Sequence, residues 1–330
     1  MSEAGPLVPS PPIQNLVRTP LTFGQILDRI LRLMRGNLKR FVALGSVPTG
    51  AMFAFYVLFA VVLLFSGAIP HPPRQPDFQK AAWIGFPVFV LAGLGLMLAF
   101  ALYEAAASHG ALLADRGISV SFREAYGLAW RDAGRYVWLA LLRAFLIGFP
   151  LFGTWIVILG GAAFLAYHGA TGITPGALFL LVPLAVLLYG GTFAYAVVMG
   201  LRLSLAYPIS VAEQLPARAA LRRSAQLTKG AKGKIFLILL VIYAISYAVL
   251  LLVEALCGLV AVLGFLAVTT MHFRMTAPWN SAGIAITVVC AFVVMFVWLA
   301  AVWASYATSL AVIYHDQLSR LDLVSPSPRS

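Results

Sequence analysis

Six apolar stretches dominate the chain, and each is long enough to cross the hydrocarbon core of a bilayer as a helix of about 20 residues. They cover approximately residues 42–69, 81–108, 137–167, 177–206, 235–268 and 284–313. Because the apolar residues follow one another without the alternation of a barrel strand, the pattern predicts helices. Charged residues make up only 10% of the 330 residues, whereas soluble domains have about 25%. The sequence therefore predicts an all-α, polytopic membrane protein with six transmembrane helices.

A basic segment recurs before the first, third and fifth apolar stretches. The segment ALRRSAQLTKGAKGKIF (220–236) aligns with ILDRILRLMRGNLKRFV (26–42), so that Arg223 matches Arg29 and Gly230 matches Gly36. A third copy, SFREAYGLAWRDAGRYVW (121–138), places Gly134 at the same position after a one-residue gap. In the first copy, apolar and charged residues separate onto two sides of a helix. We expect three repeated units, each an amphipathic cytoplasmic helix followed by a two-helix hairpin.

These units set the expected domain boundaries. The repeats cover about residues 22–120, 121–215 and 216–318 and form one membrane domain, and the ends at 1–21 and 319–330 are expected to be disordered tails. Since each unit has an even number of spans, all three have the same orientation, which favours a repeat axis along the membrane normal. We predict that the three units close into a pseudo-threefold ring; two units packed together with a peripheral third would fit the same spacing.

The ends of the surface helices have recognisable signals. Thr22 with Gln25, and Ser121 with Glu124, each fit a capping box, and Pro216 fits the first position of the third helix. Three glycines are expected to take the positive φ that ends a helix: Gly36, Gly134 and Gly230. Other glycines lie inside the spans, where they are expected to permit close helix packing: Gly93, Gly95, Gly160, Gly161, Gly190 and Gly191.

The positive charge is distributed unequally between the two sides of the predicted membrane. Of the 23 Lys and Arg residues, 18 flank the spans on the side of the two termini. Only Arg74, Lys80 and Arg274 fall on the opposite side. Because cytoplasmic loops carry the excess of basic residues, both termini are expected in the cytoplasm.

The segments TFGQILDRILRLMRGNLKRF and PARAALRRSAQLTKGAKGKIF resemble those of a prokaryotic six-span family named for the membrane domain of glycerophosphoryl diester phosphodiesterase. The resemblance covers about residues 20–318. It implies a membrane protein of the prokaryotic inner membrane and no catalytic activity, because in the family members that are phosphodiesterases a separate soluble barrel carries the chemistry. We therefore expect no phosphodiesterase activity from this chain.

Four charged residues lie within or near the apolar stretches, where charge is costly and such groups usually pair or mark a polar pathway. Glu104 and Arg202 are near the cytoplasmic ends, where snorkelling of the side chain to the interface explains them. Arg143 and Glu254 lie deeper. For these two, a structural ion pair and a polar pathway are both open.

Seven basic residues of the first and third surface helices are candidates for binding lipid headgroups: Arg29, Arg32, Arg35, Arg222, Arg223, Lys229 and Lys232. The same residues also fit a topology signal with interfacial anchoring. The partners expected are membrane lipids with anionic headgroups, and a membrane-protein partner is a further possibility. Aromatic residues are not interleaved with the basic ones, so nucleic acid is not expected. The oligomeric state is not predicted.

Each outer loop carries one histidine, namely His71, His168 and His272. In a threefold ring these could converge as nitrogen ligands of a divalent metal such as zinc. Three unrelated interfacial histidines would give the same pattern. The chain contains no GxSxG, HExxH or GxxxxGK[ST] motif. No catalytic residue and no cofactor are predicted.

The expected function is a non-catalytic, structural or accessory role in which basic interfacial helices organise lipid or a membrane partner. One alternative is a transporter or lipid-handling channel with a polar path near Arg143 and Glu254. Another is a metal-dependent membrane enzyme that uses the outer-loop histidines.

Overall fold

A computed structural model describes residues 21–65, 78–118, 120–168, 175–270 and 277–324. Within these ranges the chain forms helices and no strand, which confirms the all-α class. The helices are α1 (Phe23–Phe65), α2 (Phe78–Asp115), α3 (Phe122–Arg131), α4 (Ala133–His168), α5 (Pro175–Arg202), α6 (Ala206–Ala212), α7 (Ala217–Leu227), α8 (Lys232–Thr270) and α9 (Ala277–Val324). Six of them, α1, α2, α4, α5, α8 and α9, are long and apolar enough to cross a membrane.

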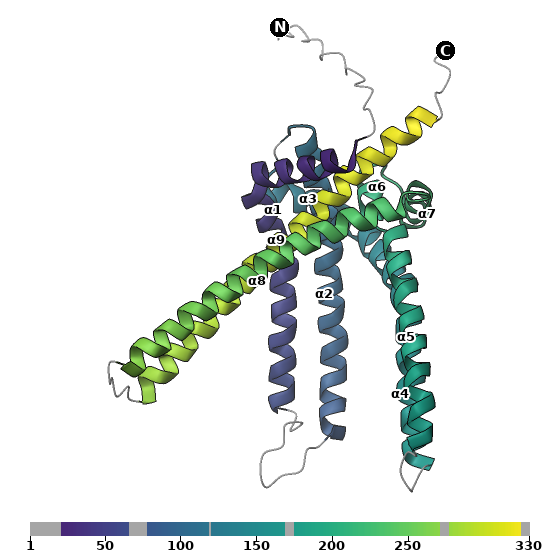
Figure 1. The fold of residues 1–330 in the computed structure, drawn as a ribbon. Coiled ribbons are helices and arrows are strands. Elements are labelled where there is room, and N and C mark those ends of the chain that lie inside the picture. The colour runs from purple at the N-terminus through teal and green to yellow at the C-terminus, as the bar shows by residue number, and fades with distance from the viewer. Residues whose placement is uncertain (1–20, 66–77, 119, 169–174, 271–276, 325–330) are drawn as a thin grey trace, which may run out of the picture.

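The six long helices form three antiparallel hairpins, α1–α2, α4–α5 and α8–α9 (Figure 1). The short helices α3, α6 and α7 lie together at one end of the molecule, and the hairpins diverge from that end (Figure 1). We call this end the cap; it consists of α3, α6, α7, the first part of α1 and the adjoining ends of the other long helices. The hairpin α8–α9 leans away from the other two (Figure 1).

The hydrophobic core lies in the cap. Its largest fully buried side chains include Tyr103 of α2, Tyr136 of α4, Leu205 before α6 and Ile235 of α8. By contrast, only 6% of the most apolar part of α4 and of α5 is buried, against 56% for α9. The hairpins are therefore joined mainly through the cap, and most of their apolar surface needs another apolar environment to cover it.

The first part of α1 lies across the cap, and the rest of α1 turns away from it along the α2 direction (Figure 1). The turn occurs at Asn37, which has φ −131° and ψ 19°. The prediction that Gly36 and Gly134 take positive φ was therefore wrong, since Gly36 and Gly134 lie inside helices and neither has such a φ. A residue other than glycine can adopt the backbone of Asn37, so no glycine is required there. Gly230, between α7 and α8, has φ +83° as predicted.

Two capping boxes fix the starts of surface helices. The Ser121 backbone N–H donates to Glu124 Oε2 at 2.8 Å, and the Glu124 backbone N–H donates to Ser121 Oγ at 3.3 Å. The hydrogen bond from the Ser121 backbone to this carboxylate is the main reason why the pKa of Glu124 lies below its ordinary value, and the Ser121 side chain adds to the effect. Thr22 and Gln25 form the same reciprocal pair at the start of α1. Pro216 instead precedes the first helical residue of α7, one position earlier than predicted.

One glycine allows two long helices to approach closely, and it is not among those predicted. A Cβ built on Gly45 of α1 would overlap the carbonyl oxygen of Ala300 in α9 and lie 3.0 Å from the carbonyl carbon. The six glycines predicted to permit packing have no neighbouring atom within 4 Å of such a Cβ. Gly45 follows Leu44 of the buried core and lies where α1 contacts α9.

The C-terminal boundary also differs from the prediction. Helix α9 continues to Val324, so the segment 319–324 is helical and not part of a disordered tail. The short helix α6 was not predicted, and almost all of it is buried in the cap. The division into three repeated units stays a prediction, as does the ring.

Candidate functional site

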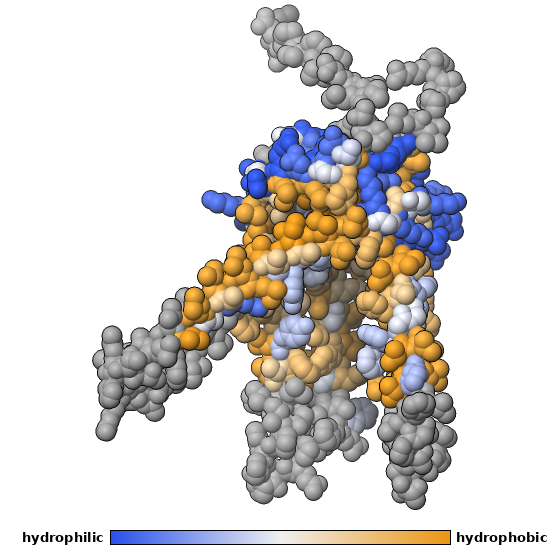
Figure 2. All heavy atoms as spheres, in the orientation of Figure 1, coloured by the Kyte–Doolittle hydropathy of each residue, from blue (hydrophilic) through white to orange (hydrophobic). Residues whose placement is uncertain are grey.

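Hydrophilic residues gather over the cap, and hydrophobic residues cover the hairpins below it (Figure 2). The seven basic residues proposed from the sequence all belong to the cap: three lie in α1, and the others lie in or just after α7. The side chains of Arg35, Arg222 and Lys229 are exposed, and that of Lys232 is partly exposed. None of these four forms an ion pair or side-chain hydrogen bond with the described residues. We call these four residues the basic rim.

The remaining candidates already have acidic partners. Arg29 donates from Nε and Nη2 to Asp115 Oδ1, at 2.8 and 2.6 Å. Asp115 is almost fully buried, and its other oxygen lies 2.6 Å from His315 Nδ1. Arg29 therefore helps to join α1, α2 and α9, which makes it a structural residue in this arrangement. Arg223 lies 3.6 Å from Glu213.

Arg32, the last of the seven, pairs with Asp28 one turn before it, and both side chains are largely exposed. Exposed pairs of this spacing contribute only about 0.3–0.5 kcal/mol. Arg32 is therefore available to a ligand at small cost, unlike Arg29.

For Arg143 the structure shows an ion pair, which is one of the two possibilities that the sequence left open. Arg143 Nη1 of α4 donates to Glu104 Oε2 of α2 at 2.6 Å, and Arg143 Nη2 donates to the Tyr306 hydroxyl at 3.2 Å. Glu104 thus has a specific partner and does not need to snorkel. Glu254 is exposed on α8, farther along the diverging hairpin, and has no contact with Arg143. The polar path near Arg143 and Glu254 stays a prediction, since the structure shows only that Arg143 is paired with Glu104.

Arg202, the fourth charged candidate, is the last residue of α5, and its side chain is exposed. Its backbone carbonyl accepts hydrogen bonds from Ser224 Oγ at 2.9 Å and Thr228 Oγ1 at 3.3 Å. These bonds tie the end of α5 to α7. The part of Arg202 that holds the cap together is therefore its backbone.

A cleft of about 260 Å³ opens beside Arg143 between α5 and α8. Most of its lining is apolar, and the polar groups in it are Arg143, Ser204, Tyr243 and Tyr306. Arg143 therefore places a guanidinium group in the lining of a largely apolar cleft.

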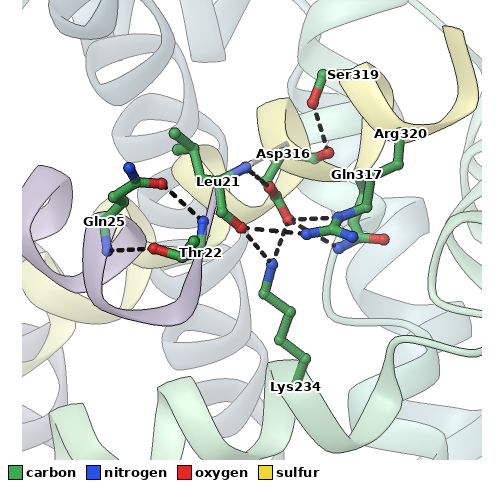
Figure 3. A network of polar contacts seen from close by, with 8 residues as sticks. All are labelled: Leu21, Thr22, Gln25, Lys234, Asp316, Gln317, Ser319 and Arg320. Atoms are coloured by element: carbon green, nitrogen blue, oxygen red, sulfur yellow. Dashed lines mark hydrogen bonds and ion pairs between the residues drawn. The ribbon is translucent and has the colours of Figure 1, made fainter. Parts of the chain in front are cut away.

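A second polar network fastens the start of α1 to α8 and α9 (Figure 3). Asp316 of α9, whose side chain is fully buried, accepts from the Leu21 backbone N–H at 2.8 Å, Lys234 Nζ at 2.9 Å and Arg320 Nε at 3.1 Å. Lys234 Nζ and Arg320 Nη2 also donate to the Leu21 carbonyl, at 3.0 and 3.1 Å. We call this the Asp316 network.

Sequence reasoning missed this network. Lys234 was counted only as part of a basic segment, and Asp316 was not singled out. One local signal was present, because Arg320 follows Asp316 by four residues and would face it on a continuing helix. Its contacts with Leu21 and Lys234 join residues 295 and 82 positions away, which no local pattern could indicate.

The histidine hypothesis stays a prediction. His71 and His272 lie outside the described residues, and so does the side chain of His168, which ends α4. Among the side chains that are described, no group of three or more His, Cys, Asp or Glu residues could hold a metal ion.

Comparison with known proteins gives no further assignment. No family model, no curated protein and no solved structure matches the chain. The contacts above are therefore the basis for any functional argument.

Proposed function

We propose that this is a non-catalytic protein of the prokaryotic inner membrane that holds anionic lipids around a cytoplasmic cap. The observation that carries the proposal is the basic rim, whose cations belong to the cap segments of α1 and α7–α8 and have no ionic partner among the described residues. Figure 2 shows hydrophilic residues gathered at this end, above the apolar hairpins. The excess of basic residues at this end supports its placement in the cytoplasm.

The diverging hairpins supply the second part of the argument. Their apolar side chains are exposed over most of their length, as shown by Phe149 and Phe152 of α4 and Leu187 of α5. In a bilayer, lipid chains would fill the spaces between the hairpins, and the headgroups of these lipids would lie beside the cap. A basic residue near the surface contributes about 1 kcal/mol to the attraction of anionic lipids. The rim thus favours anionic headgroups over zwitterionic ones.

The experiment is to neutralise part of the rim and measure the lipids that stay bound. We expect the triple variant Arg222→Gln, Lys229→Gln and Lys232→Gln to bind phosphatidylglycerol at least about tenfold more weakly, since three surface charges contribute roughly 3 kcal/mol before screening. Native mass spectrometry of the full chain, titrated with phosphatidylglycerol and with phosphatidylcholine, measures the affinity of the variant and of the unmodified protein for each lipid.

A matched control removes three positive charges from the side of the membrane opposite the rim. The variant Arg74→Gln, Lys80→Gln and Arg274→Gln changes three basic residues that the sequence assigns to the opposite side. It should retain the preference for phosphatidylglycerol. Equal losses in the two triple variants, or no preference in the unmodified protein, would contradict the proposal.

The cleft beside Arg143 supports a second candidate, a lipid-handling protein in which a lipid passes between α5 and α8. Its apolar walls and single guanidinium group would suit a lipid with a polar headgroup better than a small hydrophilic solute. In this candidate function, the polar group that would contact the lipid headgroup is Arg143, which is paired with Glu104.

Filling the cleft tests this candidate. Gly200 lines the cleft, and a Cβ built there meets no atom within 4 Å, so Gly200→Trp should enter it without displacing the backbone. If the protein moves lipid, this substitution should reduce the rate at which a fluorescent phospholipid exchanges between leaflets of reconstituted liposomes at least about fivefold. Gly190→Trp, on the same helix with equal space but outside the lining, should leave the rate unchanged. Similar rates in empty liposomes and in liposomes holding the unmodified protein would refute transport.

A further inference from the structure

A basic cleft of about 300 Å³ lies beside the Asp316 network, between the α7–α8 turn and the end of α9. Its polar lining consists of Gln226, Lys229, Lys234, Gln317 and Arg320. Figure 3 shows Lys234 and Arg320 approaching the Leu21 carbonyl and Asp316 from different helices. Lys234 and Arg320 were not among the lipid-binding candidates from the sequence, whereas Lys229 was.

The charges of the cleft do not cancel. Lys229, Lys234 and Arg320 contribute three positive charges, and among the described side chains the carboxylate that contacts Lys234 and Arg320 is that of Asp316, which is fully buried. Lys229 is exposed and has no partner among the described residues. Counted over the described side chains, the three cations exceed this one carboxylate by two positive charges, which favours an anionic occupant.

Donor groups remain after the internal contacts are made. An ammonium group has three N–H donors, and Lys234 directs two of them to the Leu21 carbonyl and Asp316. A guanidinium group has five, and two of those of Arg320 are used in the same way. Because Asp316 and the Leu21 carbonyl fix both cations, their remaining donors are held in place before a ligand binds. Such preorganisation reduces the entropy lost on binding.

A phosphate group fits these donors. It carries several strong acceptor oxygens, and charge-assisted hydrogen bonds to Lys and Arg are stronger than neutral ones. The volume is at the small end of ligand pockets, which span about 300–1,000 Å³, and suits a phosphate with a short polar substituent. We propose that this cleft binds one phosphate group, with the headgroup of an anionic phospholipid as its source.

The position of the cleft favours a lipid over a soluble phosphate ester. Lys234 is in the first turn of α8, directly before the apolar residues that continue to Leu256 in the candidate span. If α8 crosses the membrane, the cleft lies at the level of the headgroups. This inference rests on the proposed function, because it assigns one particular site to the lipid binding proposed for the rim.

The experiment compares two single substitutions of equal charge in the full chain. Lys229→Gln removes a cleft residue that does not touch the Asp316 network, so the fold should be retained. We expect it to weaken binding of the first phosphatidylglycerol about tenfold, as expected for one charge-assisted hydrogen bond. Arg222→Gln removes an exposed rim cation outside the cleft lining, and the same binding step should weaken no more than about twofold. Native mass spectrometry with stepwise addition of the lipid resolves this first step.

Two outcomes would overturn the inference, and each is distinct from failure of the rim. If Lys229→Gln and Arg222→Gln weakened binding of the first lipid equally and only slightly, the lipid would be attracted by the summed surface charge and not by a site in the cleft. The triple rim variant could still lose lipid in that case. If glycerol 1-phosphate displaced phosphatidylglycerol at equal concentration, the source would be a soluble ester and the lipid assignment would be wrong. Retention of the lipid in excess glycerol 1-phosphate, together with the tenfold effect of Lys229→Gln, would support the proposal.

Discussion

Replacing Gly45 by valine should prevent α1 and α9 from packing closely beside the cap and should destabilise the protein. The added Cβ would overlap the backbone carbonyl of Ala300, and a backbone atom within a helix cannot rotate away as a side chain can. Either α1 or α9 must then shift, which separates the two helices that bring the first and last parts of the chain together. Overpacking typically costs about 1–3 kcal/mol, and we expect at least the upper end of that range because the contact is with backbone.

The measurement is the fraction of detergent-solubilised protein that elutes as a single folded species, followed during heating. Gly93→Val is a matched control, because it makes the same substitution in α2 at a position with no atom within 4 Å of the new Cβ. It should leave the folded fraction unchanged. Equal behaviour of the two variants would mean that α1 and α9 do not cross as closely as the structure shows.

Replacing Asp316 by alanine should be nearly as damaging. The change removes the common acceptor of the Leu21 N–H, Lys234 and Arg320 and leaves two cations facing one another beside a carbonyl group. Removing one partner of a buried ion pair typically costs about 3–5 kcal/mol. We expect about 3 kcal/mol, since Lys234 and Arg320 are partly exposed and water can solvate them once the carboxylate is gone.

Resistance to heat and to limited proteolysis measures this effect. Asp28→Ala is the control, because it also breaks an ion pair to arginine, but both side chains of that pair are largely exposed and exposed pairs contribute about 0–1 kcal/mol. The Asp316 variant should additionally become sensitive to protease near Leu21, where α1 loses its attachment to α9. If Asp316→Ala and Asp28→Ala unfold alike, the network does not hold the cap together.

Much of the fold could be predicted from local sequence. The six apolar stretches gave the six membrane-length helices in order, because a backbone in hydrocarbon has to satisfy its hydrogen bonds within a helix. The Ser121–Glu124 capping box and the positive φ of Gly230 were also predicted, since each depends on residues only a few positions apart. The likeness to the six-span family and the three-unit repeat stay predictions.

The candidate site was less predictable. The exposed rim residues Arg35, Arg222 and Lys229 were identified from their position in basic surface helices. Arg29 was assigned to lipid, but Asp115, 86 residues later, holds it. For the rim residues and for Arg29, the charge and the local helix were predicted correctly. Arg29 differs because an acidic residue far away in the sequence lies next to it in the structure.

The sequence alone therefore determined the class of the protein, the order of its helices and the end at which its positive charge gathers, because these follow from hydropathy and charge along short segments. Only the tertiary structure decided that Arg143 pairs with Glu104, that Gly45 contacts Ala300 and that Asp316 joins Leu21 to Lys234. These contacts depend on how helices far apart in the chain cross in the cap. A crossing is fixed by the packing of many side chains at once, and no single segment specifies it.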